Sequence, residues 1–400
     1  MSFESKRVQR ISSSPSMVIS MLAKDLASQG RDIVDMSLGE PDFDTPAHII
    51  EAAYKAMREG HTRYTPPQGT LALRQAIVRK FQRENDLHYS VDEITVGNGA
   101  KQVIFNTFMA TLEEGDEVII PAPYWVSYSD IVTLNGGTAR VIPCGLEAGF
   151  KLSAEAFEAA ITNKTRWLVL NSPSNPSGAI YSASELQALG QVLDKHPNIL
   201  VMSDEIYEHV LLADQPFVSF ATACPHLRER TLLINGVAKA YAMTGWRIGY
   251  AAGPKQLIAA ISKIQSQNTS GASAISQAAS CEALDGPQDF VSHCAAEYSE
   301  RGRLLVDGLS QVPGLRLAAP AGAFYAFPHC AELLGRRTPD GQVLADDVQL
   351  SAYLLNNAGV AVVPGVAFGL PGYFRLSFAT SRAQITKAVA RIGEAISALR

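Results

Sequence analysis

Lys239 stands in a run whose residue types suit amine chemistry. An apolar stretch, residues 231–234, leads into the small residues Gly236 and Ala238, and Arg247 follows eight positions after the lysine. A lysine on a short, packed turn is poorly solvated, so its amine can be neutral and nucleophilic near neutral pH, as Schiff-base formation with an aldehyde requires. Arg247 could hold a phosphate through paired hydrogen bonds. Most lysines are solvated surface residues, so the prediction depends on the neighbouring motifs.

A second motif follows the apolar run at residues 199–202. Asp204 comes at its end and Tyr207 three positions later. An aspartate at the end of a buried strand is costly unless it meets a cation, and a protonated pyridine nitrogen is such a partner. Tyr207 could then donate a hydrogen bond to an oxygen on the same ring. The alternatives are an ordinary helix N-cap for Asp204 and a packed core aromatic for Tyr207.

Three weaker motifs also lie where predicted strands end. Residues 171–178 form a polar, proline-stiffened loop, and the amide of Asn175 could meet a phenolic oxygen or a substrate carboxylate. The same composition is typical of a plain surface turn. Residues 97–101 join a strand to a helix, and amides at a helix N-terminus bind phosphate. Trp125, after Pro123, could stack on a planar ring, although tryptophan is more often a core residue.

These motifs need a sheet that brings strand ends together. Apolar strands without polar alternation, separated by helical stretches, predict an α/β fold with a mostly parallel sheet covered on both faces. Ligands of such sheets bind at the carboxyl ends of the strands. The predicted strands cover residues 93–96, 117–120, 167–170, 199–203, 231–234 and 248–252.

The ends of the chain have a different character. A helix is predicted at residues 16–28 and a strand at 33–37, and alternating patterns at 315–317, 322–327 and 373–378 predict half-exposed strands. Residues 266–280 form a segment rich in small residues before a long helix.

We therefore expect a large domain, residues 48–285, and a smaller α+β domain assembled from residues 1–47 and 286–400.

Composition excludes several classes of protein. The 400 residues are 47% hydrophobic and 18% charged with a net charge of −5, which argues against nucleic acid as a main partner. No apolar run approaches the roughly 20 residues that cross a bilayer, and the charged N-terminus lacks the apolar core of a secretory signal. The five cysteines are scattered, with no CxxC pair, which favours reduced thiols over disulfides or a metal site. We expect a cytoplasmic protein.

Several of these motifs occur together in one known family. Gly39-Glu-Pro-Asp-Phe, Tyr64 before Pro-Pro-Gln-Gly, Asn175-Pro-Ser-Gly, Ser-Asp204-Glu-Ile-Tyr, Ala-Lys239-Ala-Tyr-Ala-Met-Thr-Gly-Trp-Arg and Phe-Arg375-Leu-Ser-Phe stand in family order over nearly the whole chain. The chain resembles a class I/II aminotransferase of fold type I, dependent on pyridoxal 5'-phosphate. It is most similar to the bacterial aspartate aminotransferases, a subgroup that includes aspartate/prephenate aminotransferases.

The resemblance implies a role for each matched position. Lys239 would be the catalytic lysine that bonds the cofactor and later moves the proton. The positions implied to bind the cofactor are Tyr64, Gly99, Ala100, Lys101, Trp125, Asn175, Asp204, Tyr207, Lys239 and Arg247. Tyr64 would reach the phosphate of a neighbouring subunit, which makes a homodimer with shared active sites the expected assembly.

The positions implied to bind amino-acid and 2-oxo-acid substrates are Gly39, Lys101, Trp125, Asn175 and Arg375. Arg375 would grip the α-carboxylate, and Lys101 would hold a side-chain carboxylate, with Ser14 and Ser16 nearby. Lys101 could equally be a solvated lysine in a first helical turn. The resemblance favours transfer of the amino group of L-aspartate to 2-oxoglutarate.

Two departures from the family pattern and three alternatives stay open. Gly236 stands where animal-type relatives have a phosphate-binding serine, and Ala238 where a serine often precedes the lysine. Ser12 stands where prephenate-competent relatives carry a lysine, which argues against prephenate as a substrate. The alternatives are an aminotransferase of aromatic, alanine or prephenate specificity, a pyridoxal-phosphate β-lyase, and a regulator that fuses this fold to a DNA-binding module, for which the chain lacks a basic footprint.

Overall fold

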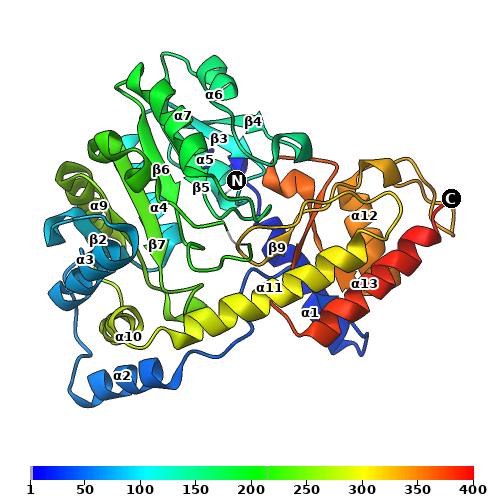
Figure 1. Cartoon of the computed structure of the whole chain (residues 1–400), viewed down its shortest axis with the longest axis horizontal. Coiled ribbons are helices and arrows are strands. Elements are labelled where there is room, and N and C mark those ends of the chain that lie inside the picture. The colour runs from blue at the N-terminus through cyan, green and yellow to red at the C-terminus, as the bar shows by residue number, and fades with distance from the viewer. Residues whose placement is uncertain (1–2, 214) are drawn as a thin grey trace.

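A seven-stranded mixed sheet forms the centre of the computed structural model, which describes residues 3–213 and 215–400 (Figure 1). Its strand order is β2-β8-β7-β6-β5-β3-β4, and every strand runs parallel to the others except β8, which is antiparallel to β2 and β7. The strands are β2 (Ile94–Gly97), β3 (Glu117–Ala122), β4 (Thr138–Pro143), β5 (Thr165–Asn171), β6 (Leu200–Asp204), β7 (Thr231–Gly236) and β8 (Gly249–Ala252).

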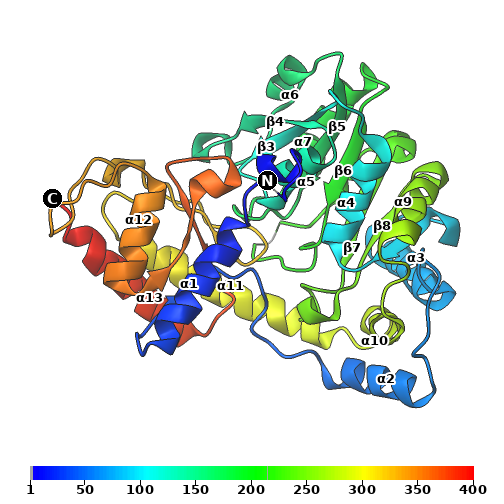
Figure 2. The same ribbon diagram turned by 180° about the vertical axis from the view of Figure 1, so that it is seen from behind.

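The central strands are apolar on both faces, and their alternate residues feed two separate cores. On β5, Trp167 and Val169 pack in the core that also contains Ile104 of α4 (Ala100–Thr111) and Ile258 of α9 (Lys255–Asn268). Leu168, which points the other way, packs in a core with side chains of α6 (Ala154–Ala160) and α7 (Ala183–Asp194). Helices therefore cover both faces, as Figures 1 and 2 show from opposite sides.

Local sequence explains where several of these helices begin. Thr70 accepts a hydrogen bond from Leu73 N at the start of α3, and Ser182 with Glu185 forms a capping box at the start of α7. The helices of this part are α2 (Ala47–Arg58), α3 (Leu71–Asn85), α4 (Ala100–Thr111), α5 (Ser127–Leu134), α6 (Ala154–Ala160), α7 (Ala183–Asp194), α8 (Phe220–Ala223), α9 (Lys255–Asn268) and α10 (Ala274–Asp285).

Both ends of the chain share another core. Val34 and Met36 pack with side chains from two long helices, α11 (Asp289–Leu309), which runs from the centre to the right of Figure 1, and α13 (Arg382–Ser397) at the right. Strand β1 pairs with β10 in parallel, and β12 lies between β11 and β9 in an antiparallel sheet. The elements are α1 (Pro15–Ser28), β1 (Val34–Asp35), α11 (Asp289–Leu309), β9 (Tyr325–Ala326), α12 (Asp347–Tyr353), β10 (Val360–Ala361), β11 (Val363–Pro364), β12 (Phe374–Ser377) and α13 (Arg382–Ser397).

The predicted α/β fold with a mostly parallel sheet is confirmed, and two local predictions are wrong. Strands β9 and β12 are fully buried, not half-exposed, because helix α11 and the N-terminal segment cover them. Residues 315–317 make one isolated bridge instead of a strand. The segment at 266–280 contains the end of α9 and the start of α10. The boundaries at 47/48 and 285/286 stay a prediction.

Within the described residues, no helix combines the length and the apolar character that crossing a bilayer needs.

The close approach of β8 to the start of α4 yields a prediction. A Cβ on Gly249 would overlap the backbone nitrogen of Ala100 and lie 2.5 Å from Gly99 C. We expect Gly249→Ala to lower the melting temperature, since overpacking costs about 1–3 kcal/mol, and to displace the amides at the start of α4. Differential scanning calorimetry measures the first effect. The control is Gly393→Ala in α13, where the nearest atom to the new Cβ is 3.7 Å away; equal melting temperatures for the two variants would contradict the prediction.

Candidate active site

The carboxyl ends of the parallel strands border a cavity of about 430 Å³. Strand β5 ends at Asn171, β6 at Asp204 and β7 shortly before Lys239. The N-terminal segment and the C-terminal part of the chain close the cavity from the other side, with Gly39 and Arg375 in its wall.

The structure brings all the predicted site residues except Tyr64 into this cavity. Those in its wall are Gly39, Gly99, Ala100, Lys101, Trp125, Asn175, Asp204, Tyr207, Lys239, Arg247 and Arg375. Tyr64 lies outside it and is 98% exposed.

Lys239 lies on the turn after β7, where its environment favours the neutral amine. Its Nζ donates a hydrogen bond to the carbonyl oxygen of Gly39 at 2.5 Å. Burial lowers the pKa of this amine to about 8, although the nearby Glu40 carboxylate opposes the shift. The neutral form is therefore far more populated near neutral pH than in an ordinary solvated lysine, in the direction that amine chemistry requires.

Asp204 is an acidic group whose pKa is shifted upward, in contrast to the lowered pKa of Lys239, because its carboxyl group is buried away from water. The residue is 4% exposed at the end of β6, and burial raises its pKa to about 6. The hydroxyl of Tyr128 donates a hydrogen bond to Oδ2 at 2.5 Å, and the amide of Ile206 donates to Oδ1 at 3.3 Å. Both bonds lower the pKa again, so they favour the charged carboxylate that a cationic ring would pair with.

Arg375 is buried on β12 at 3% exposure, which corrects the expectation of a half-exposed strand. Its guanidinium lies over the ring of Tyr325, 4.6 Å from the ring centroid, and donates to Asn175 Oδ1 at 3.0 Å. It also donates to the carbonyl oxygen of Ser37. Its Nε is buried and has no hydrogen-bond partner among the described residues. A guanidinium in a cavity wall is suited to a carboxylate ligand.

The start of α4 and Arg247 form a second cationic corner. Gly99 has φ +85°, and a Cβ there would run into the guanidinium of Arg247. Arg247 donates to the carbonyl oxygens of Thr244 and Asn98 at 2.9 and 3.3 Å. Since the first amides of a helix lack intrahelical partners, this corner suits a phosphate.

Lys101 and Trp125 cover the next part of the wall. The ammonium of Lys101 lies 4.9 Å from the centroid of the Trp125 ring. Partial burial and the neighbouring Arg247 lower the pKa of this amine, although the residue as a whole is exposed. The lysine is therefore not simply a solvated residue of a first helical turn, because its charged end lies over the cavity wall.

Sequence reasoning missed Tyr128 and Tyr325. Tyr128 lies on α5, three residues after Trp125, and its ring packs edge-on against that tryptophan. Tyr325 shares a hydrogen bond of 2.8 Å between hydroxyls with Tyr207. The spacing from Trp125 was the available signal for Tyr128. Tyr325 comes from a distant strand, and the sequence carries no signal that links it to Tyr207.

These side chains fit a phosphorylated pyridine aldehyde. The lowered pKa of Lys239 suits bonding to an aldehyde, the carboxyl of Asp204 suits a ring cation, and the glycine–arginine corner suits a phosphate. The guanidinium of Arg375, in the wall of the same cavity, suits a carboxylate.

Comparison with known proteins places the chain in a family. The family model for aminotransferase class I and II matches residues 31–392. The chain is 51% identical to an aspartate aminotransferase of Rhizobium meliloti over 98% of this chain and 96% of the relative. It is 49% identical to a probable aspartate/prephenate aminotransferase of Rickettsia felis over 100% and 98%.

Solved structures agree with this placement. The crystal structure of the aspartate aminotransferase from Rhizobium meliloti has a TM-score of 0.97 with 50% identity and full coverage of both chains. The Thermus thermophilus aspartate aminotransferase with maleate has a TM-score of 0.92 at 42% identity, covering 99% of this chain and 100% of that one. The chain therefore belongs to the class I and II aminotransferases, with the fold of the aspartate aminotransferases.

The hydrogen bond between Tyr128 and Asp204 yields a prediction. Tyr128→Phe removes a donor that lowers the pKa of Asp204, so that pKa rises and more of the carboxyl is protonated at neutral pH. We expect binding of pyridoxal phosphate to weaken about tenfold near pH 6, since a hydrogen bond to a charged group contributes about 1.5–3 kcal/mol. The ratio of variant to wild-type dissociation constants should fall as pH rises, because Asp204 then ionises in both proteins.

Absorbance titration of cofactor-free protein measures these constants. Tyr181→Phe is the matched control, because Tyr181 is an equally buried tyrosine whose hydroxyl accepts from Leu152 N instead. Equal weakening in both variants, or a ratio independent of pH, would contradict the role of Tyr128.

Proposed function

We propose that this chain binds pyridoxal 5'-phosphate and transfers the amino group of L-aspartate to 2-oxoglutarate. The observation that carries the proposal is the placement in one cavity of a lysine of lowered pKa, a buried carboxyl group and two separate cationic corners. Relatives of about 50% identity over the whole chain are named aspartate aminotransferase.

The protein side chains would divide the chemistry among them. Pyridoxal phosphate, when bound, supplies a carbonyl group that condenses with amines and a ring that withdraws electrons from the Cα of the amino acid. Asp204 would hold the ring nitrogen, Asn175 and Tyr207 the ring oxygen, and Trp125 one ring face. Arg247 and the amides of Gly99, Ala100 and Lys101 would hold the phosphate.

Lys239 would carry the catalytic step on the protein side. Its amine, neutral in part near pH 8, can accept the proton of the substrate Cα and return it to another atom. In the structure its Nζ donates a hydrogen bond to the carbonyl oxygen of Gly39, a contact that bonding to the cofactor would replace.

Two carboxylate sites would make the substrate a dicarboxylic acid. Arg375, assisted by Asn175 and Gly39, would bind the α-carboxylate. Lys101 would bind the side-chain carboxylate, with Ser14 and Ser16 at the same wall. The Oγ of Ser16 is buried and has no hydrogen-bond partner among the described residues. Maleate, with which the Thermus thermophilus relative was solved, is a dicarboxylate of comparable length.

A homodimer is part of the proposal. Tyr64 is 98% exposed and lies outside the cavity of its own chain, as expected if it reaches the phosphate site of a partner. Helices α1 and α2 also expose large apolar side chains, which a second copy would cover: Met17, Val18, Met21, Leu22, Ile50, Tyr54 and Met57. We also propose the cytoplasm as its compartment, because all five cysteines are free thiols.

The first test is the reaction with an amino donor alone. Adding L-aspartate to the cofactor-loaded protein should change the visible absorbance of the cofactor and yield oxaloacetate, and 2-oxoglutarate should then reverse the absorbance change. Stopped-flow spectroscopy follows both halves. No change with aspartate, glutamate, alanine or aromatic donors would overturn the proposal. Release of pyruvate and ammonia without a keto acid would identify a β-lyase, and prephenate as an acceptor is tested in the same assay.

The second test concerns the choice of substrate. Lys101→Ala should lower kcat/KM for aspartate about a hundredfold, because truncating one partner of a desolvated charge pair costs about 2–5 kcal/mol, and should change kcat/KM for phenylalanine by less than about threefold. Steady-state kinetics with both donors measures this. Lys263→Ala, an exposed lysine on α9 outside the cavity, is the control. An equal loss with both donors would make Lys101 a cofactor-site residue only.

A further inference from the structure

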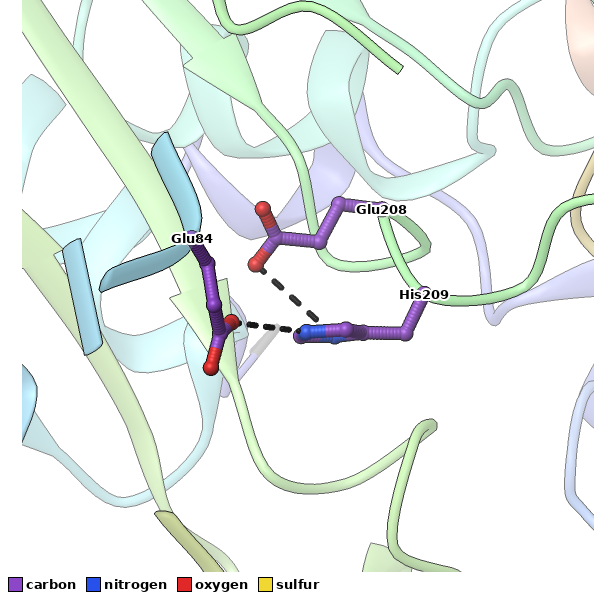
Figure 3. Close-up of side chains that lie close together, drawn as sticks. All are labelled: Glu84, Glu208 and His209. Carbon is purple, nitrogen blue, oxygen red and sulfur yellow. Dashed lines mark hydrogen bonds and ion pairs between the residues drawn. The ribbon is translucent and has the colours of Figure 1, made fainter. Parts of the chain in front are cut away.

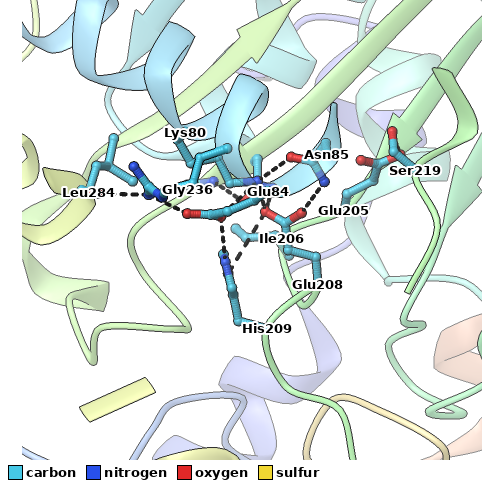
Figure 4. Close-up of polar contacts among 12 residues, drawn as sticks. Lys80, Glu84, Asn85, Glu205, Ile206, Glu208, His209, Ser219, Gly236 and Leu284 are labelled. Atoms are coloured by element: carbon cyan, nitrogen blue, oxygen red, sulfur yellow. Dashed lines mark hydrogen bonds and ion pairs between the residues drawn. The ribbon is translucent and has the colours of Figure 1, made fainter. Parts of the chain in front are cut away.

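A polar cluster around the buried side chains of Lys80 and Glu208 lies outside the cavity wall, where α3 meets residues 205–209 and 235–236 (Figure 4). We name it the Lys80 cluster, and its members are Lys80, Glu84, Asn85, Glu208, His209 and Asn235. Lys80 on α3 is completely buried, and Glu208 is 5% exposed. Burying charges in this way is unfavourable unless each finds partners.

Glu208 is the centre of these contacts. Its Oε1 accepts hydrogen bonds from Lys80 Nζ and from Asn235 Nδ2, the latter at 2.6 Å, and its Oε2 accepts from Asn85 Nδ2 at 2.9 Å. Lys80 donates in addition to Asn85 Oδ1 at 2.7 Å. Although burial alone would raise it, the charges of Lys80 and His209 hold the pKa of Glu208 below its usual value. The carboxylate is therefore charged at neutral pH.

Two carboxylates and an imidazole in this cluster could suggest a metal centre. The ligand atoms of Glu84, Glu208 and His209 all lie within 4.8 Å of one another (Figure 3). The ammonium of Lys80, however, contacts Glu208 and lies 3.5 Å from Glu84 Oε2. Since this amine already supplies the positive charge between the carboxylates, the cluster carries no metal proposal.

The position of Glu208 in the chain gives the cluster its significance. Glu208 follows Tyr207 directly, and Asn235 lies near the end of β7, four residues before Lys239. The Oδ1 of Asn235 accepts a hydrogen bond from Gly236 N at 2.7 Å. The same side chain therefore also holds the backbone amide of Gly236, where the turn that carries Lys239 (the Lys239 turn, residues 236–239) begins. One carboxylate therefore connects the segment of Tyr207 to the segment of Lys239, and Lys80 anchors that carboxylate to α3.

We propose that Glu208, through its hydrogen bond to Asn235, is a positioning residue that fixes the Lys239 turn against the Tyr207 segment. The amine of Lys239 lies 5.8 Å from the centroid of the Tyr207 ring. Buried charged hydrogen bonds are directional, so the link restricts the lysine turn more than apolar packing of small residues such as Gly236 and Ala238 would. Only the expected effect on catalysis rests on the proposed function; the structural role of Glu208 does not.

The test compares two asparagines that bind the same carboxylate. Asn235→Ala removes the link to the lysine turn, whereas Asn85→Ala removes a hydrogen bond to Glu208 from α3, away from both cofactor-bearing segments. In the cofactor-loaded protein we expect Asn235→Ala to lower kcat for aspartate about fivefold with little change in KM, as loss of one hydrogen bond would do. The pH midpoint of the cofactor absorbance should move by about half a unit. Asn85→Ala should lower the melting temperature and leave kcat and the midpoint unchanged.

A second measurement separates this inference from the proposed function. Reductive methylation of the cofactor-free chain at several pH values, read by mass spectrometry, gives the pKa of the Lys239 amine. That pKa should rise by about half a unit in Asn235→Ala, because a loosened turn admits water, and stay constant in Asn85→Ala. Suppose the wild-type protein is inactive with every donor, but the Lys239 pKa is still higher in Asn235→Ala than in wild type. This result would overturn the transaminase proposal and leave the positioning role intact.

Equal behaviour of the two variants in both measurements would overturn the positioning role. If Asn235→Ala does not fold, Asn235→Ser, whose shorter side chain cannot reach Glu208, tests the same link. Circular dichroism verifies folding of each variant before the comparison.

Discussion

The burial of the Asp204 carboxyl group at the end of β6 is the constraint on which the rest of the site depends. Its partners in the structure are a hydroxyl and an amide, from Tyr128 and Ile206, and these stabilise the charged form only in part. A cationic ligand would restore the interaction that the carboxylate lost on leaving water. The apolar sheet around Asp204 offers no water and few polar groups, so the charged carboxylate is poorly stabilised without such a ligand.

The same burial acts on Lys239 with the opposite sign. A low-polarity environment disfavours charge of either sign, so it raises the pKa of Asp204 and lowers that of Lys239. The pKa values of both groups thereby move toward neutral pH. In that range the Asp204 carboxylate could pair with a ring cation, and the neutral amine of Lys239 could attack a carbonyl group. Arg375, also buried, keeps its charge because guanidinium loses its proton only at far higher pH. Burial thus shifts the pKa of Asp204 and of Lys239 toward neutral pH, whereas Arg375 stays charged in spite of its burial.

Sequence reasoning located the parts of the site that depend on chain order. Lys239, Asp204 and Asn175 follow apolar strands, and a parallel sheet must bring such positions to one edge. It failed where the determinant is a contact between distant segments. The alternating pattern around Arg375 resembles a strand with one solvent-exposed face, but all four residues of β12 are buried because helix α11 and the N-terminal segment cover the strand. Tyr325 approaches Tyr207 only because both chain ends fold into one core.

Helix α10 was missed for a local reason. Its sequence is rich in serine and alanine, which weakens the apolar periodicity on which helix prediction depends. Its buried face includes the polar residues Ser276, Gln277 and Ser280, and the Oε1 of Gln277 accepts a hydrogen bond from Thr70 N at 2.7 Å. Pattern reasoning assumes that buried positions are apolar, and here the hydrogen bonds that make polar burial possible involve residues far away in the sequence.

The run from Ser203 to Glu208 shows how tertiary partners divide roles among similar side chains. Asp204 has a pKa of about 6 in contact with hydroxyl and amide donors. Burial, reinforced by the charge of Glu208, raises the pKa of Glu205 to about 8, so it is mostly a neutral acid near pH 7, and one of its oxygens has no partner among the described residues. Glu208 stays charged because Lys80 contacts it.

The sign of the Glu205 effect follows from its raised pKa. Its proton is bound more tightly in the folded chain than in the unfolded chain, so its contribution to stability is complete at low pH and disappears as pH rises through about 8. Glu208 contributes in the opposite sense, since its pKa is lowered and its contribution disappears on acidification. Three acidic residues within five positions therefore differ in pKa because their partners differ. Asp204 has Tyr128 of α5, Glu205 has Ser219 and Phe220 at the start of α8, and Glu208 has the partners from α3 and β7.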